Sequence, residues 1–150
     1  MNRIIALRYN SFLNSIRVVD SCNEVLGTLA KQYRLGLLSN YPCGHTIRGS
    51  LERNGVAGYF HAIVISDEVG FVKPHSRPFE RIIEALEVTP KETVYVGDNW
   101  LADIQGAKRM GMGAIHTCQW DTPEKFDAHA KDHAPDHTIH DLRELLALRL

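Results

Sequence analysis

The sequence predicts an α/β fold in which helices cover both faces of a mainly parallel sheet. Short apolar runs alternate with longer segments whose apolar residues recur at helical spacing, which is typical of successive βαβ units. The runs are apolar along nearly their whole length, as strands are when both faces of a parallel sheet are buried. Three of the runs end in polar residues, which favours a ligand site at the carboxyl ends of the strands.

The first half of the chain is expected to hold two helices, a strand and a further helix. Apolar residues at steps of four, three and four predict a helix over 4–16. Ser21 followed by Glu24 is the pattern of a capping box at the start of the second helix. The apolar run 34–40 predicts a buried strand, and the helix after it is expected to end at Gly55.

The second half continues the alternation of strands and helices. The expected strands are 62–67, 93–98, 114–118 and, at an edge of the sheet, 137–140. Pro78 is expected to open a helix, and Gly111 to end the helix that follows the strand 93–98. Thr122 begins a short helix, and Asp141 with Glu144 forms the capping box of the last one.

Composition excludes several classes of protein. A chain of 150 residues, 44% hydrophobic and 23% charged, is expected to form one globular domain. Its 17 basic and 18 acidic residues leave a formal net charge of −1, which argues against a nucleic-acid partner. No apolar run approaches the length needed to span a membrane. The cysteines Cys22, Cys43 and Cys118 are widely spaced, which argues against a disulfide framework and favours a cytoplasmic location.

The polar residues at the ends of the strands suggest a shared chemistry. Asp98 ends one strand and Asp103 follows in the next helix, and two nearby carboxylates favour Mg²⁺. Ser39 and Asn40 end another strand just before a helix, where a hydroxyl and backbone N–H groups can hold a phosphate. Lys73 adds a compact positive charge. A metal, a lysine and a hydroxyl around one anion are typical of phosphoryl transfer.

The order of these motifs resembles that of the haloacid dehalogenase superfamily. The segments LLSN (37–40), VGFVKP (69–74) and VGDNWLAD (96–103) look like its second, third and fourth motifs, and QGAKRMGMGAI (105–115) looks like the continuation. The resemblance covers about 18–146. It implies a Rossmann-like three-layer sandwich. The two acids of the GDxxxxD pattern look more like the family's Mg²⁺-dependent phosphatases than its dehalogenases.

The resemblance also implies a role for each residue. Ser39 would donate a hydrogen bond to the transferred phosphoryl group, and Asn40 would belong to the same phosphate site. Lys73 would neutralise charge around the phosphate. Asp98 would ligate Mg²⁺, whereas Asp103 would either support the metal or hold Lys73. The implied activity is hydrolysis of a small phosphate ester through an aspartyl-phosphate.

The sequence departs from the family at its first motif. The pattern DxDx[TV], whose first Asp is the family's nucleophile, does not occur in the sequence. By resemblance, 1–17 would be a remnant of the cap-domain helix and 18–150 the core, without its central first strand. We therefore expect this chain to be inactive alone. The gap could be closed by the flanking strands, filled by the N-terminal segment or covered by a second copy; closure or a dimer is favoured.

Two other hypotheses follow from the residues. The missing nucleophile makes a non-catalytic module that binds an anion or a partner the alternative function. Cys43 at a helix start could replace the nucleophile, but only four residues separate it from Arg48, and the cysteine phosphatase loop that it resembles needs five. His129 and His133 could share a helix face as a zinc pair, but no third ligand is indicated by spacing.

Overall fold

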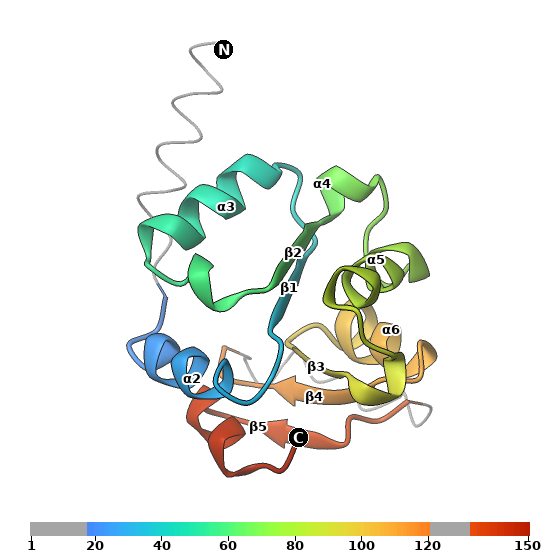
Figure 1. Cartoon of the computed structure of the whole chain (residues 1–150). Helices are drawn as coiled ribbons and strands as arrows, with labels where there is room; N and C mark the ends of the chain where they lie inside the picture. Colours follow the sequence, from blue (N-terminus) through green and yellow to red (C-terminus); the bar gives the residue numbers. More distant parts are fainter. Residues whose placement is uncertain (1–17, 121–132) are drawn as a thin grey trace.

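Short parallel strands flanked by helices make up the part of the chain that the computed structural model describes, 18–120 and 133–150 (Figure 1). The predicted α/β fold is confirmed, and every strand pair in this part is parallel. The strands are β1 (Gly36–Ser39), β2 (Ala62–Ile65), β3 (Val94–Gly97), β4 (Gly113–Thr117) and β5 (His137–Ile139). Each lies within or beside the apolar run that predicts it.

Helices and single turns connect these strands. The longer helices are α2 (Cys22–Leu29), α3 (Gly44–Arg53) and α5 (Ser76–Leu86). The shorter ones are η1 (Ala57–Tyr59), α4 (Ser66–Val69), η2 (Pro90–Glu92), the π-helix η3 (Trp100–Gln105), α6 (Gly106–Arg109) and the 3₁₀ helix η5 (Leu142–Ala147). Gly55 and Gly111, just beyond α3 and α6, have positive φ angles of 70° and 81°, which glycine adopts at little cost. No helix in the described ranges is both long and apolar enough to cross a membrane.

Several local predictions differ from the structure. The capping box at Asp141 is present, but Ser21 makes no side-chain capping bond because its backbone is already helical, with φ −71° and ψ −12°. Asp67 belongs to α4 and not to the end of a strand. Pro78 is the third residue of α5 and not its opening residue. The helices predicted over 4–16 and from Thr122 lie outside the described residues.

Two apolar clusters lie on opposite faces of the strands. The first joins β1, β2 and α5 to α6 and contains Leu38, Val64, Phe79, Ile82, Ile83, Leu86, Ile104, Ala107, Met112 and Ala114. The second joins α2 and η5 to β4 and β5 and contains Val25, Leu29, Ile115, Ile139 and Leu145. Ala114 and Ile115 are neighbours in β4 but belong to different clusters, because successive strand residues point to opposite faces.

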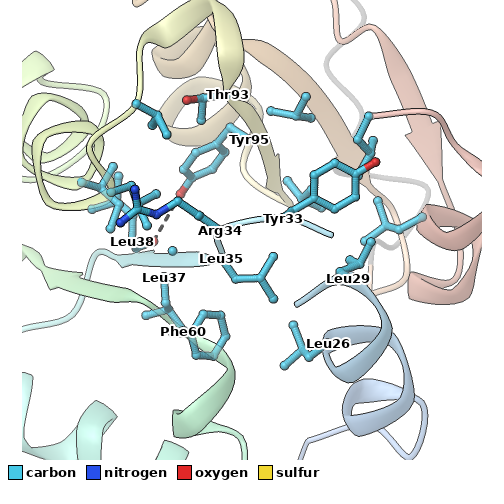
Figure 2. Close-up of a pocket in the computed structure, with 18 of the residues that line it drawn as sticks. Leu26, Leu29, Tyr33, Arg34, Leu35, Leu37, Leu38, Phe60, Thr93 and Tyr95 are labelled. Carbon is cyan, nitrogen blue, oxygen red and sulfur yellow. Dashed lines mark hydrogen bonds between the residues drawn. The ribbon is translucent and has the colours of Figure 1, made fainter. Parts of the chain in front are cut away.

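The strands form two sheets and not one. β1 pairs with β2, and a second sheet has the order β3–β4–β5 (Figure 1). The expected closure of the flanking strands is wrong for the described residues, because β1 and β3 are not paired with each other. Between them lies a hollow of about 560 Å³, which we call the slot (Figure 2).

Candidate functional site

A polar hollow of about 350 Å³ lies where the carboxyl ends of β1 and β3 meet. All five residues that the sequence singles out, Ser39, Asn40, Lys73, Asp98 and Asp103, line it. They come together because the carboxyl ends of parallel strands reach the same edge of a fold, even though the strands belong to two sheets. We call this site the polar hollow.

Lys73 and Asp103 form a buried ion pair at the floor of the polar hollow. Lys73 Nζ donates to Asp103 Oδ1 at 2.6 Å, and the two side chains are only 8% and 6% exposed. The same ammonium donates to the hydroxyl of Tyr95 at 2.6 Å and to the carbonyl of Leu38 at 3.1 Å. All three protons of the ammonium therefore have acceptors, as a buried charge requires.

Asn40 holds the backbone of Lys73 in place. Its Oδ1 accepts from the Lys73 N–H at 2.8 Å, and its Nδ2 donates to the Lys73 carbonyl at 3.0 Å. An amide side chain that bonds both backbone groups of one residue fixes that residue's position and orientation. Asn40 thus ties the end of β1 to the loop that carries the lysine.

The turn after β3 holds Asp103. The Asn99 N–H donates to Asp103 Oδ2 at 3.0 Å, and Asn99 Oδ1 in turn accepts from the Ala102 N–H at 2.8 Å and caps η3. A Cβ added at Gly97 would stand 2.5 Å from the Cβ of Asp103, so only glycine leaves room for this approach. Both carboxylate oxygens of Asp103 are therefore engaged, which suits holding Lys73, the second of its two predicted roles.

Tyr95 is a member of the site that the sequence reasoning missed. Its hydroxyl donates to the Leu38 carbonyl at 3.2 Å and lies 3.4 Å from Asp103 Oδ1, while its ring packs edge-on against Phe79. Burial, followed by the charge of Asp103, raises the pKa of Tyr95 well above its usual value. The sequence holds a signal for Tyr95: it is two residues before Gly97 in the same strand, so it lies on the face that packs against Asp103.

Asp98 is the exposed carboxylate of the polar hollow. Its backbone carbonyl lies 3.0 Å from Nε2 of His116, a side chain buried to 3% exposure that sequence reasoning also missed. Lys73, Asp98 and Asp103 are the charged residues that line the hollow, and their formal charges of +1, −1 and −1 sum to −1. An exposed carboxylate in a hollow of this sign suits a divalent cation that keeps several waters.

The described residues contain no group of three or more His, Cys, Asp or Glu side chains that could hold a metal ion. Among the described residues that line the polar hollow, Asp98 is the carboxylate that is not engaged with Lys73. A single carboxylate is within the range of Mg²⁺ sites, which often use one or two carboxylates. The residues present are compatible with such an ion, which Asp98 would hold.

The segment around Cys43 lies outside the polar hollow. The Cys43 sulfur accepts from the Thr46 hydroxyl at 3.1 Å, and Arg48 forms an ion pair with Glu68 at 2.8 Å. Because this pairing occupies the arginine, the segment does not form a phosphate loop around Cys43. Of the histidines considered for a zinc pair, His129 falls outside the described residues.

Comparison with known proteins identifies relatives over most of the chain. A family model described as haloacid dehalogenase-like hydrolase matches residues 2–117. A glyceraldehyde 3-phosphate phosphatase of Methanothermobacter thermautotrophicus is 38% identical over 85% of this chain and 57% of its own length. The pyrophosphatase PpaX of Bacillus mycoides is 29% identical over 86% of this chain and 58% of its own length. The chain thus spans less than two thirds of these curated relatives.

Solved structures of similar fold include enzymes with different names. A HAD phosphatase of Thermococcus onnurineus matches with a TM-score of 0.78 and 28% identity, over 92% of this chain and 60% of that one. An L-2-haloacid dehalogenase of Xanthobacter autotrophicus matches with a TM-score of 0.79 over 97% of this chain and 66% of that one. At 20% identity the second match shows the fold alone.

Proposed function

The chain belongs to the haloacid dehalogenase-like hydrolase family, and on that premise we propose that its polar hollow binds the phosphoryl group of a small phosphate ester together with Mg²⁺. The observation that carries the proposal is the meeting of Ser39, Lys73 and Asp98 in one hollow at the carboxyl ends of two strands. The names of the curated relatives support the phosphatase type. A hollow of about 350 Å³ supports a small ester as the ligand.

Each residue has a definite task in this proposal. The Ser39 hydroxyl donates a hydrogen bond to a phosphoryl oxygen, and the Lys73 ammonium supplies positive charge close to the reacting group. Asp103 and Asn40 act through Lys73: one balances its charge and the other holds its backbone. They are positioning residues, because the polar atoms of Asn40 bond the Lys73 backbone and those of Asp103 bond the Lys73 ammonium and the Asn99 N–H.

Charge explains why a cation belongs to the site. A phosphate ester carries up to two negative charges, and the polar hollow already has a formal charge of −1. Binding the anion alone would therefore place like charges together. Mg²⁺ held by Asp98 would offset that charge when bound, and a phosphate oxygen would complete its shell of waters.

Hydrolysis in this family's manner also needs a carboxylate nucleophile, which would accept the phosphoryl group before water releases it. The sequence contains no DxDx[TV] motif to supply one. We therefore propose that this chain by itself binds but does not turn over the ester. Incubation with p-nitrophenyl phosphate and Mg²⁺ should release no nitrophenol above background. Release that Asp98→Ala abolishes would contradict this part of the proposal.

Calorimetric titration with inorganic phosphate tests the binding. Phosphate should bind roughly tenfold or more tightly in millimolar Mg²⁺ than in EDTA, because the ion reverses the sign of the hollow. Asp98→Asn should remove most of the Mg²⁺ dependence, whereas Asp20→Asn, the same change at an exposed carboxylate outside the hollow, should leave it intact. Equal phosphate affinity with and without Mg²⁺ in the unaltered chain would refute the proposed cation.

The alternative function is a non-catalytic module that binds an anion or a partner. The observation that favours it is the missing nucleophile motif. Phosphate binding without turnover of p-nitrophenyl phosphate would favour the module. Turnover that Asp98→Ala abolishes would favour the enzyme.

A further inference from the structure

Two segments that build the polar hollow are bonded to each other through side chains. The first segment, 39–44, leads from β1 to α3, and the second, 66–73, contains α4 and ends at Lys73 (Figure 1). In one contact, the Asn40 side chain bonds both the N–H and the carbonyl of Lys73. In the other contact the relation is reversed, because a side chain of the second segment bonds both backbone groups of a residue in the first.

Ser66 makes this reversed contact. Its hydroxyl oxygen accepts from the Tyr41 N–H at 3.0 Å, and its hydroxyl proton is donated to the Tyr41 carbonyl at 3.2 Å. Ser66 directly follows β2 as the first residue of α4 and is only 6% exposed. A hydroxyl carries one proton and two acceptor positions, so it can bond an N–H and a carbonyl at the same time. The end of β2 is thereby joined to the chain that leaves β1.

The bond to the Tyr41 N–H also fixes the neighbouring residue, Asn40. The peptide group between these two residues is planar from one Cα to the next, so the Tyr41 N–H turns together with the Asn40 Cα and carbonyl. From that Cα the Asn40 amide reaches the Lys73 backbone at 2.8 and 3.0 Å. Ser66 therefore controls, through one peptide plane, where the Asn40 amide stands.

Two further contacts join α4 to α3. Asp67 Oδ2 accepts from the Gly44 N–H at 3.2 Å, and Glu68 Oε2 lies 2.8 Å from Arg48 Nη2. The side chains of Arg48 and Glu68 are 42% and 39% exposed, so water weakens the attraction between their charges. The buried hydroxyl of Ser66, bonded to the residue next to Asn40 in sequence, is therefore the contact best placed to act on the hollow.

We propose that Ser66 is a positioning residue of the phosphate site. Its hydroxyl fixes the segment that carries Ser39 relative to the loop that carries Lys73. Ser66 itself is not among the residues that line the polar hollow, so it acts without touching the bound ligand. The effect on phosphate binding rests on the proposed function, whereas the positioning rests on the contacts alone.

Loss of the hydroxyl should affect the two sides of the hollow unequally. The Lys73 ammonium has three acceptors, and Ser66 contributes none of them. The peptide that follows Asn40, in contrast, would lose the bond that fixes its plane, and Ser39 directly precedes Asn40 in the chain. A bound phosphate should therefore lose mainly its contact with the Ser39 hydroxyl.

Hydrogen exchange followed by NMR tests the positioning without any ligand. The Lys73 N–H donates to Asn40 Oδ1, and its exchange rate is compared with that of the Ile83 N–H inside α5, which reports on the stability of the whole fold. In Ser66→Ala the Lys73 rate should rise at least about fivefold more than the Ile83 rate. Ser50→Ala is the matched control, because Ser50 is also 6% exposed but lies in α3 outside the hollow. It should leave the ratio of the two rates unchanged.

Calorimetric titration with inorganic phosphate in millimolar Mg²⁺ tests the effect on the site. Ser66→Ala should weaken phosphate binding about three- to tenfold, which is the net effect of losing one hydrogen bond. In a Ser39→Ala background the same change should weaken binding by less than about twofold, because the contact that it controls is already absent. If the unaltered chain binds no phosphate, the proposed function fails, and the exchange rates still decide the positioning.

Two results would overturn the inference. One is a rise in the Lys73 exchange rate of folded Ser66→Ala that is no greater than the rise for Ile83, because the hydroxyl would then only support the fold in general. The other is equal weakening of phosphate binding with and without the Ser39 hydroxyl. Circular dichroism checks that Ser66→Ala is folded. Ser66→Cys, a weaker donor and acceptor of similar size, repeats both measurements with less change in packing.

Discussion

Removing the ammonium of Lys73 should strongly destabilise the fold. Lys73→Met leaves the Asp103 carboxylate, in a side chain 6% exposed, without its counter-charge. Its remaining contacts are the Asn99 N–H at 3.0 Å and the Tyr95 hydroxyl at 3.4 Å. Breaking a buried pair in this way costs roughly 3–5 kcal/mol in free energy of unfolding. At about 2–4 °C per kcal/mol for a chain of this size, Tm should fall by about 6–20 °C.

The chain contains a matched control. Lys108 Nζ and Asp136 Oδ1 are 2.7 Å apart, almost the same distance as in the buried pair, but these side chains are 23% and 48% exposed. Water screens such a pair, so Lys108→Met should lower the free energy of unfolding by less than about 1 kcal/mol. Both variants replace a lysine by methionine, so the difference between their losses in free energy of unfolding isolates the effect of burial.

Urea denaturation followed by circular dichroism provides the free energies. The double variant with Lys73→Met and Asp103→Asn should lose less than the sum of the two single variants, because neither charge is then left alone. Two results would refute the reasoning. One is a cost for Lys73→Met no larger than that for Lys108→Met. The other is strict additivity in the double variant.

Two further predictions concern the same wall of the polar hollow. Burial and the charge of Asp103 raise the pKa of Tyr95, so the folded chain keeps the phenol proton where the unfolded chain releases it. The free energy of unfolding should therefore stay constant up to about pH 10 and fall as the pH rises further. Urea titrations from about pH 8 to 11 should show a smaller fall for Tyr95→Phe than for the unaltered chain. An equal fall in both proteins would count against a buried phenol. Gly97→Ala should lower the stability by about 1–3 kcal/mol in thermal melts, since its Cβ would stand 2.5 Å from that of Asp103, which Lys73 holds in place. An unchanged Tm would show that Asp103 can move aside.

Much of the fold follows from local patterns in the sequence. The apolar runs predict the strands because strands buried on both faces must be apolar along their length. Gly55 and Gly111 mark helix ends because the positive φ angles there suit glycine. The capping box at Ser21 was predicted by the same kind of rule and is wrong. The backbone of Ser21 is already helical and its side chain makes no capping bond, which the spacing of Ser21 and Glu24 does not reveal.

The members of the candidate site could be predicted, but their contacts could not. Ser39 and Asp98 stand at the ends of apolar runs, and the rule for parallel strands brings such ends together. Asp103 follows in η3, and Lys73 lies in the loop between α4 and α5, where the family resemblance predicts it. Whether Asp103 faces a metal or Lys73 depends on distances of a few ångström. Tyr95 and His116 were missed because a strand residue's role depends on which neighbouring strand or turn its side chain meets.

The sequence by itself determined the α/β class, the order of the elements, the family resemblance and the residues gathered at the strand ends. These depend on periodicity and on the chemistry of short segments, which act over a few residues. The tertiary structure decided that the strands form two sheets, that a slot separates β1 from β3, and that Lys73 is neutralised by Asp103. Such features depend on which backbone edges and side chains meet across long stretches of chain, and hydrogen bonds and ion pairs form only between groups that packing brings within about 3 Å.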